Sequence, residues 1–200
     1  MHTLYQFQSS GNCYKLRLAM HQLGIPFHKV EVDILQKQSR TPEFLAMNPN
    51  GRIPVLKVGE RYLPESNAAL WYLAQGSALM PTDSFAQAQL LQWMFFEQYS
   101  HEPNIATIRY WVHIANTADQ FEQEIEAKRK AGYAALRVMD THLAGNPYLV
   151  AGQYSIADIA LYAYTHVAAE GGFDLSSFTH IARWLSDIEA QPGYINMANS

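Results

Sequence analysis

The sequence predicts an α/β domain followed by an all-helical domain. Over residues 1–76, stretches with the alternating apolar pattern of strands are interleaved with stretches that have the apolar spacing of helices. After residue 84, only the helical spacing remains. Residues 77–84 contain Ser, Pro and Asp, which are common in connecting segments. We therefore expect an α/β domain at 1–76, a linker at 77–84 and a helical domain at 85–200.

The expected elements of the N-terminal domain follow one another in a defined order. Gly24 predicts the end of the first helix, and Thr41 with Pro42 predicts the cap and first turn of the next one. The elements are strand, helix, strand, helix, hairpin and helix, at Leu4–Phe7, Tyr14–Leu23, Phe27–Val32, a short helix from Pro42, Val55–Leu63 and Ser66–Ala74. This order is that of the thioredoxin-like fold, in which a right-handed crossover joins the parallel strands.

The C-terminal domain is expected to contain amphipathic helices. They are predicted at Phe85–Tyr99, at Phe121–Leu143, from Ser155 onward and at Ile181–Glu189. Ser155 and Asp158 have the spacing of a capping box, with Asp in place of the usual Glu. The first of these helices carries aromatic residues around much of its circumference: Phe85, Trp93, Phe95, Phe96 and Tyr99. Because one core needs only one apolar stripe, the excess predicts a second buried face, either in a two-fold homodimer or along a pocket.

Composition and charge limit the classes of function. The chain has a formal net charge of −4 over 200 residues and no strong basic cluster, which gives no support for nucleic-acid binding. No apolar run approaches the roughly 20 residues that span a bilayer, and the N-terminus lacks the pattern of a signal peptide. The single cysteine, Cys13, excludes an intrachain disulfide and fits a reducing compartment. We expect a cytoplasmic protein that binds neither membranes nor nucleic acids.

The segment Asn48–Leu56 and the pair Glu65-Ser66 carry most of the functional information. Pro54 occupies the first position of a predicted strand, where it cannot donate to the ladder. A cis Ile53–Pro54 bond would turn the preceding backbone outward and leave the N–H and C=O of Ile53 for an extended peptide. At the start of the next helix, the N–H groups and hydroxyl of Ser66 are suited to a carboxylate, and Glu65 is suited to an ammonium group.

These motifs resemble the glutathione-contacting region of cytosolic glutathione S-transferases, in the bacterial type with Ser or Asn in the active-site motif. The resemblance covers nearly the whole chain, from His2 to the capping box at Ser155–Asp158. It implies a thioredoxin-like N-terminal domain, an all-helical glutathione transferase C-terminal domain and a homodimer. It also implies that the thiol of glutathione, a co-substrate, is activated for attack on a small hydrophobic electrophile in detoxification. No cofactor and no metal is expected.

The resemblance assigns residues to the parts of glutathione. Ile53, before a cis Pro54, would pair with the cysteinyl backbone. The pair Glu65-Ser66 would hold the γ-glutamyl end. Gln38 and Arg40 lie in the loop where the family contacts the glycyl end, and they are therefore candidates for that contact.

The turn before the first helix carries the candidate catalytic residues Ser10 and Asn12. Free N–H groups and the positive end of the helix dipole stabilise a thiolate there. A hydroxyl or amide that donates to sulfur lowers a thiol pKa from about 8.5. The resemblance favours Ser10 for this role, with Asn12 second, and the alternative is that both residues only cap the helix. Cys13 is either a thiol activated by the helix end or a small residue packed in the core.

Residues at the expected end of the first long helix of the C-terminal domain are candidates for an electrophile pocket. Tyr99, His101 and Arg109 would line or flank it, and a packed helix end is the alternative. Glu97 and His101 are four residues apart, but no third ligand follows at a supporting spacing, so no metal site is expected. Two other functions stay open: a glutathione-dependent peroxidase or disulfide reductase that uses Cys13, and a non-catalytic glutathione-binding stress protein.

Overall fold

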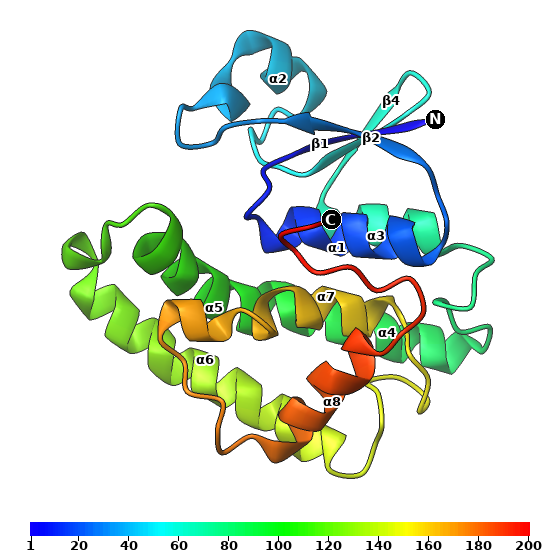
Figure 1. Ribbon diagram of the computed structural model, residues 1–200, viewed down its shortest axis with the longest axis vertical. Helices are drawn as coiled ribbons and strands as arrows, with labels where there is room; N and C mark the ends of the chain where they lie inside the picture. The colour runs from blue at the N-terminus through cyan, green and yellow to red at the C-terminus, as the bar shows by residue number, and fades with distance from the viewer. The chain divides into compact units, whose positions relative to one another are not determined.

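A computed structural model describes the chain from Met1 to Ser200 and divides it into two compact units (Figure 1). The first unit contains Met1–Ser77 together with Pro192–Ser200, and the second contains Ala78–Gln191. The last nine residues differ from the expectation, which assigned all of 85–200 to the helical domain. Main-chain carbonyls of these residues accept hydrogen bonds from Gln8, Tyr14 and Lys29 of the first unit, and apolar periodicity does not reveal such contacts.

A mixed four-stranded sheet forms the centre of the first unit. Its strands lie in the order β2-β1-β3-β4, with β1 parallel to β2, and with β3 antiparallel to both β1 and β4. The strands are β1 (His2–Gln6), β2 (Phe27–Glu31), β3 (Val55–Val58) and β4 (Arg61–Pro64). The helices are α1 (Gly11–Gln22), α2 (Pro42–Met47) and α3 (Ser66–Ala74). Figure 1 shows α1 and α3 on one face of the sheet and α2 on the other. This is the thioredoxin-like arrangement.

Both faces of the sheet are covered by apolar side chains. On the face of α1 and α3, the fully buried residues include Leu4, Leu16, Leu56 and Leu70. On the face of α2, the core cluster contains Val32, Phe44 and Val55, with Tyr5, Met47 and Ile53 packed against it. Thr41 caps α2 as predicted, because its hydroxyl accepts from the N–H of Phe44 at 3.3 Å. Ile53, which packs on the α2 side of the sheet, directly precedes Pro54 and the start of β3.

The second unit is helical. Its helices are α4 (Ser84–Phe96), α5 (Glu102–Arg109), α6 (Glu122–Leu143), α7 (Ile156–Thr165) and α8 (Thr179–Glu189). Every residue of α7 is buried, and this helix contacts α4, α5 and α8. The predicted capping box is present at its start, since the Asp158 carboxylate accepts from the N–H of Ser155 at 2.9 Å and Ser155 caps the first turn. None of the helices combines the length and apolar character that crossing a membrane requires.

The first long helix of this unit does not end at Tyr99, as the sequence suggested. A π-helical turn at Glu97–His101 leads directly into α5, and a second π-helical turn follows at Tyr110–Ile114. Pro103 is the second residue of α5 and directly follows the π-helical turn, so it has no N–H to donate to that turn. The proline therefore marks the start of a helical segment and not a stop.

Candidate functional site

Ser10 closes the turn between β1 and α1 and begins the helix. Its N–H donates to the carbonyl of Phe7 at 2.9 Å. Its hydroxyl oxygen accepts from the N–H of Cys13 at 3.3 Å, which makes Ser10 the N-cap of α1. A serine hydroxyl also carries one proton that rotates to suit its partner. The cap geometry thus leaves Ser10 chemically able to donate to a sulfur atom at the helix start.

Cys13 lies in the interior of the first unit. Its side chain is fully buried, and burial raises the pKa of its thiol to about 11 although the Ser10 hydroxyl and the Phe7 backbone act in the opposite direction. A thiol with such a pKa is protonated at neutral pH and is a poor nucleophile. This environment favours the interpretation of Cys13 as a packed small residue over that of a redox-active thiol.

A hydrogen bond connects the start of α1 to the start of α3. The Ser66 hydroxyl donates to Asn12 Oδ1 at 3.1 Å. The fully buried Lys15, also on α1, donates through Nζ to Ser66 Oγ at 3.4 Å and to Asn67 Oδ1 at 3.2 Å. Asn12, the second candidate for the thiol end, and Ser66, predicted for the γ-glutamyl end, are therefore in direct contact. Sequence reasoning missed Lys15, because a lysine within a helix is usually exposed.

Glu65 precedes α3 in an unusual backbone conformation. Its φ of 68° and ψ of 108° lie in a region that residues other than glycine rarely adopt. Such a residue costs about 1–3 kcal/mol of strain and tends to occur where a ligand site requires it. The Glu65 side chain is exposed and makes no capping bond to α3. Glu65 is thus the residue at the N-cap position of α3, and it directly precedes the buried Ser66.

The peptide bond between Ile53 and Pro54 is cis, which confirms the prediction. Ile53 lies outside the registers of the sheet and outside the backbone bonds of the surrounding turns. The buried Asn48 holds this loop, because its Nδ2 donates to the carbonyl of Arg52 at 2.7 Å and its Oδ1 accepts from the N–H of Asn50 at 3.1 Å. The sequence pointed to this segment, but it gave no sign that Asn48 fixes its shape.

Gln38 and Arg40 lie on a 3₁₀ turn beside this loop and contact main-chain groups of the first unit. Gln38 Oε1 accepts from the N–H of Asp33 at 2.8 Å. Arg40 Nη1 donates to the carbonyl of Asn50 at 3.1 Å, and it lies so close to Gly51 that an added Cβ there would be 2.5 Å away. Both side chains are exposed and stabilise the loop between β2 and β3.

The residues predicted for the electrophile pocket do not share one environment. Tyr99 is 87% exposed, whereas His101 is fully buried and its Nε2 lies 2.9 Å from the hydroxyl of Thr165. Arg109 is also buried, and its Nε donates to the Glu170 carboxylate at 2.6 Å. The sequence could not show these contacts, because the partners of both residues lie far along the chain. His101 and Arg109 therefore belong to the packed interior of the helical unit.

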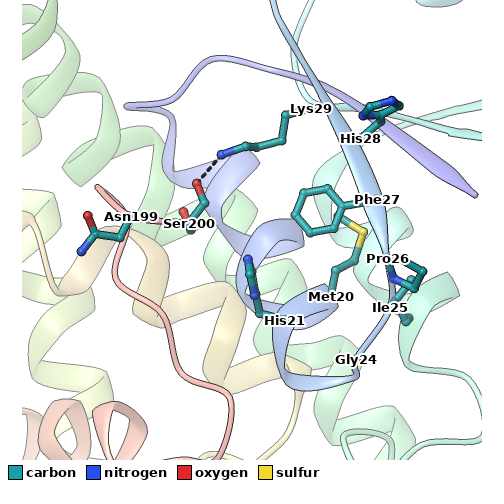
Figure 2. A pocket seen from close by; sticks show the side chains of 10 residues that line it. All are labelled: Met20, His21, Gly24, Ile25, Pro26, Phe27, His28, Lys29, Asn199 and Ser200. Carbon is teal, nitrogen blue, oxygen red and sulfur yellow. Dashed lines mark hydrogen bonds between the residues drawn. The ribbon is translucent and has the colours of Figure 1, made fainter.

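A groove of about 730 Å³ opens at the other end of α1 (Figure 2). Met20 and Phe27 contribute apolar side chains to it, and Lys29 lies at its edge, where Nζ donates to the Ser200 carbonyl at 2.7 Å. None of the residues predicted for a ligand site lines this groove. The candidate site therefore consists of the starts of α1 and α3 and the segment before β3.

Comparisons with known proteins agree with this architecture. The family model of the glutathione S-transferase N-terminal domain matches residues 9–75, and that of the glutathione S-transferase C-terminal domain matches residues 93–192. A crystal structure of a possible glutathione S-transferase from Rhodopseudomonas palustris is 50% identical, with a TM-score of 0.98 over 100% of this chain and 91% of that one. A glutathione S-transferase from Pseudomonas fluorescens is 47% identical, with a TM-score of 0.97 over 99% of both chains. The disulfide-bond oxidoreductase YfcG of Escherichia coli is 26% identical over 93% of this chain and 89% of its own length.

The fold defines a two-domain protein with a thioredoxin-like unit followed by a helical unit. Two family models together match most of the chain, and two solved glutathione S-transferase structures have nearly the same fold. The chain belongs to the glutathione S-transferase family.

Proposed function

We propose that the protein is a glutathione transferase that activates the thiol of glutathione for attack on a small hydrophobic electrophile. The observation that carries this proposal is the 3.1 Å hydrogen bond from Ser66 to Asn12, which joins two helix N-termini in one site. Helix N-termini favour anions. One of them suits the γ-glutamyl carboxylate, and the other suits the thiolate of the same tripeptide.

Glutathione binds across three elements in this proposal. Ser66 and the first N–H groups of α3 bind the γ-glutamyl carboxylate, and Glu65 pairs with the ammonium group. The N–H and C=O of Ile53 pair with the cysteinyl backbone in the manner of an added strand. Gln38 and Arg40 reach the glycyl carboxylate from the neighbouring loop. The cysteinyl side chain then lies at the start of α1.

The chemical step is nucleophilic attack by the bound thiolate. The start of α1 favours the ionised form, and donors from Ser10 and Asn12 lower the thiol pKa from about 8.5 towards neutrality. The thiol proton leaves to solvent, the thiolate sulfur forms a bond to the electrophilic carbon, and the leaving group departs. No residue of the protein becomes covalently attached, and the site contributes by orientation and charge stabilisation.

The roles of Ser10 and Asn12 are separable by experiment. Ser10→Ala and Asn12→Ala are compared by titrating the thiolate absorbance of bound glutathione against pH. We expect Ser10→Ala to raise the thiol pKa and to lower kcat more than it weakens glutathione binding. If only Asn12→Ala raises the pKa, the two roles are exchanged. If neither variant changes the pKa or kcat, the proposed activation at the start of α1 is incorrect.

A thiol–disulfide reaction is the second candidate, since YfcG is a disulfide-bond oxidoreductase. The burial of Cys13 makes a protein thiol an unsuitable nucleophile for it. The bound glutathione thiolate would instead attack one sulfur of a disulfide, forming a mixed disulfide and releasing the other sulfur as a thiolate. Conjugation, peroxide reduction and mixed-disulfide reduction are assayed side by side. Glutathione binding without any of these activities would identify a non-catalytic binding protein.

We further propose that the protein is a cytoplasmic homodimer. Three aromatic side chains on or next to α4 are exposed in the single chain, namely Phe85 at 71%, Phe95 at 67% and Tyr99 at 87%. An exposed group of large aromatics on one helical segment favours burial against a second copy. Sedimentation at micromolar concentration tests this, and a fully active species of monomer mass would contradict it.

A further inference from the structure

The last residues of the chain bind to the part of the first unit that contains the β1–α1 turn. Figure 1 shows this C-terminal segment lying along α1. The Tyr14 hydroxyl donates to the carbonyl of Ile195 at 2.7 Å, and Gln8 Nε2 donates to the carbonyl of Met197 at 2.7 Å. The ammonium group of Lys29 donates to the carbonyl of Ser200 at 2.7 Å (Figure 2). We refer to Ile195–Ser200 as the tail segment.

Arg17 connects the tail segment to the turn. Its side chain is fully buried. Nε donates to Ser200 Oγ at 2.6 Å, and Nη2 donates to the carbonyl of Gln8 at 2.8 Å. Nη1 donates to the side-chain oxygen of Gln6, and Nη2 also lies 3.4 Å from the carbonyl of Met197. A buried guanidinium needs acceptors for its donors, so the tail segment and the turn hold the same group in place.

Gln8 makes hydrogen bonds to Glu31, Arg17 and Met197. Its N–H donates to the Glu31 carboxylate at 2.7 Å, its carbonyl accepts from Arg17, and its side chain donates to Met197. Two residues later, Ser10 closes the turn through its 2.9 Å bond to Phe7. The conformation that presents Ser10 is therefore fixed on one side by the cap of α1 and on the other by Arg17 and the tail segment.

We propose that Arg17 and the tail segment position the Gln8–Ser10 turn for activation of the glutathione thiol. Arg17 is a positioning residue, because it acts through the carbonyl of Gln8 and touches no reacting atom. The inference rests on the proposed glutathione function. Its physical basis is that small displacements of an activating group strongly reduce the rate, by as much as about a hundredfold for about 1 Å.

Arg17→Met tests the proposal, with Arg183→Met as the matched control. Arg183 lies in the helical unit and likewise donates to main-chain carbonyls, those of Leu143, Asn146 and Pro147. We expect Arg17→Met to lower kcat about tenfold while the KM for glutathione changes less than about threefold. The pKa of the bound thiol should rise, and amide exchange at Gln8 and Ser10 should become faster. Arg183→Met should lower stability and change none of these quantities.

Ser200→Ala keeps the test decisive if Arg17→Met does not fold. This substitution removes only the hydroxyl that accepts from Arg17 and donates to Met197 at 3.1 Å. We expect a smaller change in the same direction in amide exchange and thiol pKa. Wild-type values of both quantities in a folded variant would overturn the proposal. Failure of the wild-type protein to bind glutathione would instead reject the proposed function, so the two failures are distinguishable.

Discussion

Replacement of Ser66 by alanine is expected to weaken glutathione binding by about 1–3 kcal/mol, or about 5- to 150-fold in Kd. We expect the single Ser66 hydroxyl proton to turn from Asn12 to the carboxylate when glutathione binds, and such a charge-assisted contact is stronger than a contact between neutral groups. The substitution also removes the bond to Asn12 at 3.1 Å and one acceptor of Lys15 at 3.4 Å. Lys15 keeps Asn67 Oδ1 as an acceptor at 3.2 Å. The change is therefore local to the starts of α1 and α3.

Isothermal titration calorimetry with glutathione measures the effect. The matched control is Ser155→Ala, because Ser155 is also a buried serine at the start of a helix, where its hydroxyl accepts from the N–H of Ala157 at 3.3 Å and donates to Asp158 at 3.1 Å. Both variants should lose about 1–2 kcal/mol of stability, but only Ser66→Ala should lose affinity. Equal affinities of a folded Ser66→Ala and the wild type would refute the assignment of Ser66 to the carboxylate.

Three further predictions concern the titratable groups Asp158, His166 and Cys13, of which Asp158 and Cys13 are fully buried and His166 partly so. Asp158→Asn should lower the stability of the helical unit at pH 7.5 by about 2–4 kcal/mol in urea unfolding. The reason is that the N–H groups of Leu149, Trp184 and Ser155 donate to the carboxylate at 3.0, 2.9 and 2.9 Å, whereas an amide offers only one oxygen. An unchanged urea midpoint would contradict this. Burial lowers the pKa of His166 to about 4, so the unfolded chain binds the proton more tightly, and stability is lost as pH falls from about 6.5 to about 4. His166→Gln should reduce this loss by up to about 3 kcal/mol, and unfolding curves with the same pH slope as the wild type would refute it. Because burial raises the pKa of Cys13 to about 11, its thiol should react with a disulfide reagent only after unfolding, and Cys13→Ala should keep activity; rapid labelling of the native protein would show that the thiol is accessible.

The parts of the fold that follow local rules could be predicted from the sequence. The bounds of α3 agree with the expected helix at Ser66–Ala74, and Thr41 and Ser155 cap the helices that they were expected to cap. Turn and cap chemistry acts over a few residues, so it is visible in a single sequence. The cis bond before Pro54 was also predicted, but this needed the family resemblance, since cis bonds before proline are uncommon.

The features that were not predicted depend on partners that lie far along the chain. The π-helical turn at Glu97–His101 has no compositional signal. For His101 and Arg109, the sequence left both a pocket and a packed helix end open, and the structure shows both side chains buried. His101 contacts Thr165, which lies 64 residues further along the chain, and Arg109 contacts Glu170, which lies 61 residues further along. No pattern within the helix itself indicates that such polar side chains point inward.

The same limitation explains why α1 was understood only in part. Apolar spacing marks its core face, but Lys15 and Arg17 are fully buried as well. Lys15 reaches the start of α3, and Arg17 reaches the tail segment and Gln8, so the two cations fix the helix on separate sides. Burying a charge is unfavourable unless its donors are satisfied, which is why a sequence rule places both outside. These two cations hold the helix along its length, in addition to the contacts at its N-terminus, where Ser10 caps the first turn and Ser66 donates to Asn12. A fixed helix is what the proposed stabilisation of a thiolate at this helix end requires, because preorganised dipoles need no reorganisation when the charge develops.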